Sequence, residues 1–264
     1  MPSLIVLTSL LIVLGQSLCA QDAKSIIEAG VKAAGWDKVK GDFSSWSDVG
    51  TLNFAGQKMD YKTDWKLHEP TARYSMILKM QSSGTAMEVS YRFDGQQAFE
   101  SMGDMKQEVT GPKLEYTRNA GNLFRVSSLR PLLRSPTDRL EAIEVPMVHG
   151  RPTVGVRVKS PDLRPVTLIF DAGTGLLVKS EMTVANEFED WKEALEETYY
   201  GDWTDAGNGV KNFRTLKVVR GGKTLIESKL SPAKREEKPD WAGSAFAKPR
   251  EFAAASTSGC QVQP

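Results

Sequence analysis

The residues that first suggest chemistry are Gly173, Thr174 and Gly175, a glycine-rich stretch between two apolar runs. A phosphate-binding loop places such glycines directly before a helix, so that free N–H groups and the helix dipole face the anion. Here apolar residues recur at every second position on both sides, over residues 165–171 and 176–184. That period is typical of strands. The stretch therefore predicts a hairpin turn and not a phosphate site.

The other reactive side chains are sparse. His68 and His149 are far apart in the sequence, and neither has a second ligand at metal-binding spacing. The acidic runs 187–197 and 234–238 mix both charge signs, which is typical of solvated surfaces, although a carboxylate pair could lie within them. A hydrolase with an inconspicuous site would need carboxylates clustered at the mouth of a cavity. The sequence predicts no catalytic residue, no metal site, no cofactor and no enzyme activity.

The composition describes an ordinary globular protein of 264 residues, with 40% hydrophobic and 25% charged residues and a net charge of +1. There is no basic stripe interleaved with aromatic residues, so we expect no nucleic-acid partner. The two cysteines, Cys19 and Cys260, lie at opposite ends of the chain and form no disulfide framework.

The first twenty residues have a different character from the rest. Residues 4–14 are apolar, which is too short for a bilayer span, and small or polar residues follow as far as Ala20. We interpret residues 1–20 as a signal peptide and expect a periplasmic or secreted protein. Lipid anchoring at Cys19 is a less favoured alternative, and a buried N-terminal helix is another.

Two regions have helical character. Residues 22–39 predict an amphipathic helix with Asp22 as the N-cap and Gly35 as the stop. Its apolar face contains Ile26, Ile27 and Val31. Residues 112–136 predict one or two short helices that cross the sheet, interrupted at Gly121 and Pro131.

Most of the remaining chain predicts β-strands with one buried and one solvent-exposed face, a pattern that is typical of antiparallel sheets. The predicted strands are residues 58–67, 73–80, 87–93, 140–145, 153–158, 165–171, 176–184, 196–203, 213–219 and 224–230. At about 4.8 Å per strand the sheet is about 50 Å wide. A few helices, each about 10 Å across, cannot cover a flat sheet of that width. The sheet must therefore curl around them.

The fold class is accordingly mainly β (α+β). We expect a curved antiparallel half-barrel sheet of about ten or more strands, with an N-terminal helix and helical lid segments in the concavity. Residues 21–231 form a single domain in this interpretation, and residues 232–264 form a closing segment and a disordered tail.

The inward positions of the first strands carry flat and adaptable side chains, and methionine suits a surface that repacks around variable guests. On composition alone, an ordinary filled core is the favoured interpretation of these positions. The inward residues are Tyr61, Trp65, Tyr74, Met76, Leu78, Met80, Met87, Val89 and Tyr91.

Three stretches resemble the periplasmic outer-membrane lipoprotein carrier (LolA-like) superfamily and its lipoprotein-sorting relatives. "EPTARYSMIL" (69–78) is similar to a strand in which an Arg-aromatic pair, here Arg73 and Tyr74, follows a proline. "LIFDAGTGLLVKSEM" (168–182) resembles a hairpin of that family. The segment from residue 199 to "DWAGSAFAKP" resembles its closing hairpins and final Phe-x-x-Pro, here Phe246 and Pro249.

The resemblance implies a non-catalytic carrier in the bacterial envelope whose concave face binds a lipid or a lipidated protein. The binding set is then the nine inward residues together with Arg73. The alternative is a regulatory or interaction module that docks an envelope protein partner through the same fold. We expect a monomer in either case.

Overall fold

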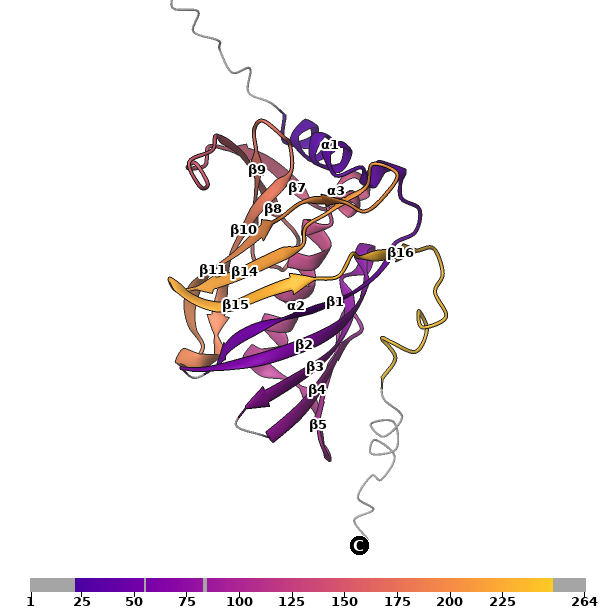
Figure 1. Cartoon of the computed structure of the whole chain (residues 1–264), viewed down its shortest axis with the longest axis vertical. Helices are drawn as coiled ribbons and strands as arrows, with labels where there is room; N and C mark the ends of the chain where they lie inside the picture. The colour runs from indigo at the N-terminus through magenta and orange to yellow at the C-terminus, as the bar shows by residue number, and fades with distance from the viewer. Residues whose placement is uncertain (1–21, 55, 83–84, 249–264) are drawn as a thin grey trace, which may run out of the picture.

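The computed structural model describes residues 22–54, 56–82 and 85–248 (Figure 1). The first half of the sheet consists of β1 (Phe43–Phe54), β2 (Gln57–His68), β3 (Arg73–Ser82), β4 (Thr85–Phe93), β5 (Ala98–Met102) and β6 (Met105–Val109). The second half consists of β7 (Arg139–Ile143), β8 (Thr153–Lys159), β9 (Val166–Asp171), β10 (Leu177–Asn186), β11 (Lys192–Gly201), β14 (Thr215–Arg220) and β15 (Lys223–Leu230).

These strands form one antiparallel sheet in the order β6-β5-β4-β3-β2-β1-β15-β14-β11-β10-β9-β8-β7, with β16 (Lys234–Glu236) also paired to β1. The small strands β12 (Thr204–Asp205) and β13 (Lys211–Asn212) pair separately. The large sheet has fourteen strands and remains open, since β6 and β7 are its two unjoined edges. The predicted fold class is confirmed.

In the described part of the chain, three helices accompany the sheet: α1 (Ala23–Ala33), α2 (Gly111–Ser127) and α3 (Arg130–Arg134). In Figure 1 the sheet bends around α2, and α1 lies across one end near β7 and β8. We call the face of the sheet that packs against α2 the inner face. Short 3-10 turns occur at η1 (Trp36–Lys38), η2 (Glu69–Thr71) and η3 (Glu187–Glu189). None of the helices in the described part is long and apolar enough to cross a bilayer.

The predicted N-terminal helix is confirmed as α1, and its apolar side chains Ile26, Ile27 and Val31 are buried. Asp22 precedes the helix, but its side chain makes no capping hydrogen bond. Gly30 allows a close approach to the sheet, because a Cβ there would lie 2.8 Å from the ring of Phe170. The helix therefore seals the end of the core formed by the second half of the sheet.

The prediction that Gly121 interrupts the lid helices is wrong. It lies in the middle of the 17-residue helix α2. A Cβ at this position would lie 2.8 Å from the carbonyl oxygen of Ala72, which follows η2. Glycine is required by the close approach of the helix to the sheet and not by a turn.

The stretch that contains Gly173 and Gly175 is the predicted hairpin turn between β9 and β10. Asp171 Oδ1 accepts hydrogen bonds from the backbone N–H groups of Gly173 and Thr174 and from the Thr174 hydroxyl. The free donors of the turn are thereby satisfied within the turn itself.

The chain beyond β15 folds back over the outer face of the first strands. Trp241 packs edge-on against Phe43, with ring centroids 5.7 Å apart, and its ring lies 6.0 Å from that of Phe246. The predicted signal peptide at residues 1–20, and the part of the predicted tail from Pro249 onward, lie outside the described residues.

Candidate functional site

Nine of the predicted binding residues share the inner face of β2, β3 and β4, in direct register. Tyr61 pairs with Met80, which pairs with Met87. Directly opposed residues in antiparallel strands point to the same side of a sheet. The next rows along the same face are Leu78 with Val89, Trp65 with Met76 and Tyr91, and Leu67 with Tyr74 and Phe93.

Arg73 does not belong to this face, which corrects its inclusion in the predicted set. Strand geometry places it opposite its neighbour Tyr74. Its guanidinium lies over the ring of Phe246, 5.4 Å from the centroid. It also donates to Thr71 Oγ1 (2.9 Å) and lies 3.2 Å from His68 Nδ1. Arg73 therefore attaches the segment after β15 to the outer face.

The inner face is covered at one end and open at the other. Near α2, Tyr74 and Phe93 are buried, and the ring of Phe124 lies 5.5 Å from Tyr74 and 5.1 Å from Trp65. Toward the opposite ends of the same strands burial decreases, and Met87 is 41% exposed. The open end therefore presents apolar side chains to solvent.

Methionine dominates this open end. Six of the nine methionines of the chain occur between residues 59 and 105. The register places all six on the inner face. They are Met59, Met76, Met80, Met87, Met102 and Met105. We call this set the methionine face; its unbranched, polarizable side chains adapt to guests of variable shape.

A buried carboxylate lies at the centre of the inner face. Asp48 on β1 accepts hydrogen bonds from the Tyr61 hydroxyl (2.6 Å) and from Trp65 Nε1 (2.8 Å). Burial raises the pKa of Asp48 above its usual value, and the same burial raises the pKa of Tyr61. Sequence reasoning missed Asp48, although it occupies the inward phase of its strand together with Trp46, which stacks on Trp65 at 5.6 Å.

Helix α2 is tied to both halves of the sheet by polar contacts. Lys113 Nζ lies 2.6 Å from Glu100 on β5, and the Tyr116 hydroxyl accepts a hydrogen bond from Arg220 on β14 (2.8 Å). Burial alone would raise the pKa of Glu100, but hydrogen bonds from Lys113 and Tyr91 hold it below its usual value. The first turns of α2 thus bridge the concavity.

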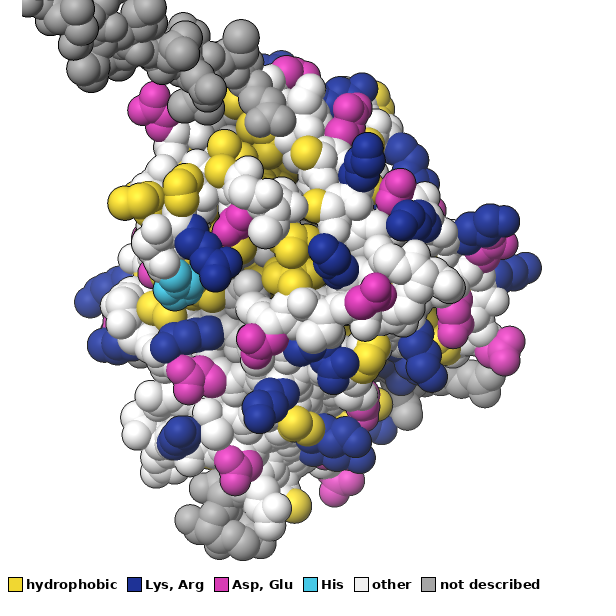
Figure 2. All heavy atoms as spheres, turned by 45° about the horizontal axis from the view of Figure 1, so that its top comes forward, with side chains coloured by type: hydrophobic (Ala, Val, Ile, Leu, Met, Phe, Trp, Pro, Cys, Tyr) yellow, Lys and Arg dark blue, Asp and Glu magenta, His cyan; other side chains and the backbone are white. Residues whose placement is uncertain are grey.

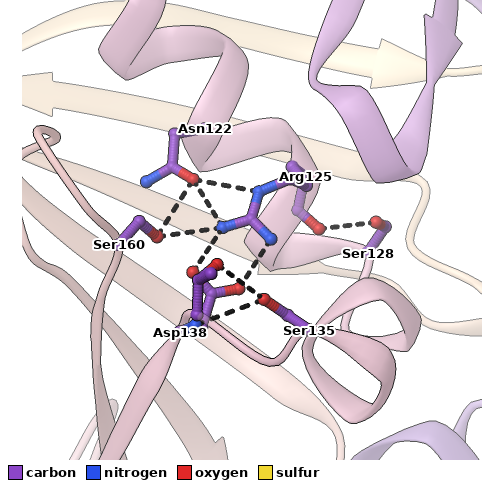
Figure 3. A network of polar contacts seen from close by, with 7 residues as sticks. Asn122, Arg125, Ser128, Ser135, Asp138 and Ser160 are labelled. Carbon is purple, nitrogen blue, oxygen red and sulfur yellow. Dashed lines mark hydrogen bonds and ion pairs between the residues drawn. The ribbon is translucent and has the colours of Figure 1, made fainter.

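A second polar network fixes the other end of α2 (Figure 3). Arg125 forms a two-pronged contact with Asp138, at 2.7 and 2.9 Å, and donates to Asn122 Oδ1 and Ser160 Oγ. Burial alone would raise the pKa of Asp138, but the Arg125 guanidinium holds it below its usual value. Asn122 and Asp138 were not singled out by the sequence, because their spacing has no characteristic period.

The described residues contain no group of three His, Cys, Asp or Glu side chains that could hold a metal ion. His68 ends β2, and His149 lies in the turn before β8. On the side of the molecule shown in Figure 2, acidic and basic side chains are interspersed, with small apolar areas between them.

No family model matches this sequence, and no curated protein matches it. Solved structures do resemble the fold. A LolA superfamily protein from Nitrosomonas europaea is 10% identical, with a TM-score of 0.54, and the match covers 86% of this chain and 97% of that one.

Two further structures match to a similar degree. A DUF1329 family protein from Desulfovibrio piger is 9% identical, with a TM-score of 0.53 over 85% of this chain and 97% of that one. A domain from Vibrio parahaemolyticus assigned to outer-membrane lipoprotein sorting is 9% identical, with a TM-score of 0.52 over 83% and 95%. The open half-barrel of this chain therefore has the fold of the LolA superfamily and of lipoprotein-sorting domains.

Proposed function

We propose that the protein is a non-catalytic carrier that binds the acyl chains of a lipid or a lipidated protein on its methionine face. The observation that supports this most directly is the change in burial along β4, whose inner face is buried at Phe93 (2% exposed) and Val89 (5% exposed) and becomes exposed at Met87 (41% exposed). A filled core would bury both ends of this strand. Here one end packs on α2, and the other leaves an adaptable apolar surface.

The energetics favour an apolar guest. Each acyl CH₂ transferred from water contributes about 0.8 kcal/mol. An acyl chain that lies across the rows of Leu78 and Met80 is therefore held by the burial of apolar surface and needs no polar contact. The Asp48 carboxylate and the ion pair between Lys113 of α2 and Glu100 lie at the borders of this surface. The resemblance in fold to lipoprotein-sorting domains supports the same class of ligand.

The proposal includes the cellular setting expected from the sequence. Residues 1–20 direct export to the periplasm or the outside of the cell, and residues 21–231 act as one domain and as a monomer. The alternative remains a regulatory module that docks an envelope protein on the same fold.

A matched pair of variants on β3 tests the carrier function. Titration of the purified chain with a fluorescent palmitate analogue should show saturable binding. Met80→Asp places a charge on the methionine face and should weaken this binding at least about tenfold, which corresponds to about 1.4 kcal/mol. Ile77→Asp carries the same charge on the outer face of the same strand, where Ile77 is already 38% exposed, and should bind like the wild type.

Circular dichroism confirms that both variants are folded. Full affinity in a folded Met80→Asp protein would show that the methionine face does not bind the acyl chain. Native mass spectrometry of protein purified gently from its own envelope complements this test. A mass equal to the bare processed chain, together with no binding of the palmitate analogue, would favour the partner-docking alternative.

A further inference from the structure

A cavity of about 460 Å³ lies away from the methionine face, on the open side of the half-barrel. One wall is the β4–β5 turn around Phe93 and Gly95, and the facing wall is the β8–β9 loop from Ser160 to Leu163. The floor is the side of α2 that carries Asn122 and Arg125. We propose that this cavity binds a compact organic anion, independently of the carrier function.

The walls of the cavity suit a small apolar body. Four proline rings line it, together with Phe93 and Leu163. The prolines are Pro70, Pro131, Pro136 and Pro161. Rigid rings lose little conformational freedom when a ligand binds. The volume falls within the range of about 300–1,000 Å³ that is common for small-molecule sites.

The charges around the cavity select an anion. Arg125 is compensated by Asp138 at 2.7 Å. Arg134 and Arg130 share the single carboxylate of Asp42, at 3.0 and 3.1 Å.

Arg118 also lines the cavity, and it donates to the carbonyl oxygen of Gln96 (3.1 Å) and not to a carboxylate. The nearby Glu69 is already paired with Arg235. Among the residues that line the cavity, three arginines (Arg118, Arg125 and Arg134) therefore outnumber the one carboxylate, Asp138.

The floor is held in one arrangement before any ligand arrives. Asn122 Oδ1 accepts from Arg125 Nε, Arg125 Nη2 and Ser160 Oγ, so the orientation of the amide is fixed (Figure 3). Asn122 Nδ2 is buried and has no partner within the described part of the chain. The Asn122 amide therefore holds the Arg125 guanidinium in one arrangement, and a preorganised cation favours anions over cations.

Binding of small aromatic probes tests the site. Phenyl phosphate and benzoate carry an anion on a compact ring, benzylamine carries a cation on the same ring, and inorganic phosphate is the head group alone. Isothermal titration calorimetry should detect binding of one or both aromatic anions, weaker binding of inorganic phosphate and none of benzylamine. The stronger of the two anions identifies the head group as phosphate or carboxylate.

Two variants locate the binding. Arg118→Gln removes an exposed cation from the cavity wall and should weaken anion binding about tenfold, the scale of one charged hydrogen bond. Arg157→Gln removes an equally exposed arginine from β8, outside the cavity lining, and should leave it unchanged.

The proposal is overturned if neither aromatic anion binds, if benzylamine binds as well as they do, or if a folded Arg118→Gln protein retains full affinity. Loss of anion binding in Met80→Asp would place the probes on the methionine face and would also overturn it. If Met80→Asp loses binding of the palmitate analogue but keeps anion binding, the cavity proposal is supported. The carrier proposal and the cavity proposal can therefore be rejected independently.

Discussion

The two halves of the sheet present opposite kinds of inner face. In the second half, Val156, Val158, Val166 and Leu168 are fully buried beneath the helices. In the first half, the corresponding rows are rich in aromatic and methionine side chains, and Met87 and Met105 are 41% and 48% exposed. The second half is thus close-packed, whereas the first half has a smaller buried cluster around Tyr74 and Phe93 and an exposed region at Met87 and Met105. We therefore expect the stability of the fold to depend more on the second half of the sheet than on the first.

The largest difference in unfolding free energy is expected between variants of the polar contacts that hold α2 against each half of the sheet. Arg125→Gln leaves Asp138 as a buried, unpaired carboxylate, which typically costs about 3–5 kcal/mol of unfolding free energy. Lys113→Gln breaks the contact with Glu100 in the first half, where the lysine is partly exposed, and should cost about 1 kcal/mol or less. Urea denaturation followed by circular dichroism measures both. Equal losses would show that α2 is fixed by the two halves alike.

Core truncation should give the next largest difference. Leu168→Ala creates a cavity in the second half and should lower the unfolding free energy by about 2–5 kcal/mol. Met80→Ala removes a half-buried side chain from the methionine face and should cost about 1 kcal/mol or less. Thermal and urea denaturation of the two variants give the comparison. A loss above about 2 kcal/mol for Met80→Ala would mean that the first half is a filled core as well.

The smallest effect concerns pH and the buried Asp48 of the first half. Its pKa is raised in the folded state, so the native protein holds this proton more tightly than the unfolded chain does. Its contribution to stability is greatest below the unfolded pKa and is lost as the pH rises through the raised folded pKa. Asp48→Asn has no group that ionises at this position. The unfolding free energy of the variant, relative to the wild type, should therefore increase with pH between the unfolded and the folded pKa of Asp48.

The check is urea denaturation of both proteins at a series of pH values. Parallel curves for wild type and Asp48→Asn would show that ionisation of Asp48 is not coupled to folding.

Strict alternation made most strands predictable, because most of those strands bury one face more deeply than the other; β9 is buried on both faces. The hairpin of β5 and β6 was not predicted. Residues 105–108 of β6 are exposed on both faces at the sheet edge, so no period marks them. Pairing with β5 and not burial defines this strand.

The inner-face residues were predictable for the same reason, since a period of two separates the faces. Arg73 was misplaced because a family motif, and not its strand phase, put it in the set. The charged cavity could not be predicted from the sequence, because Arg118 on α2 and the β8–β9 loop come to line the same cavity only through the tertiary fold.

The central position of β1 has a consequence for how the chain acquires its structure. β1 pairs with β15, so Asp48 lies opposite Leu230 in the middle of the sheet. Contacts between segments so distant in sequence carry a large loop-closure cost and form slowly. During synthesis the halves β1–β6 and β7–β15 emerge separately, and neither has its neighbour until the last long strand is made. We expect the joining of the two halves to be the late step of folding, and a chain truncated before β15 to expose the aggregation-prone edges of β1 and β14, which β15 covers in the finished protein.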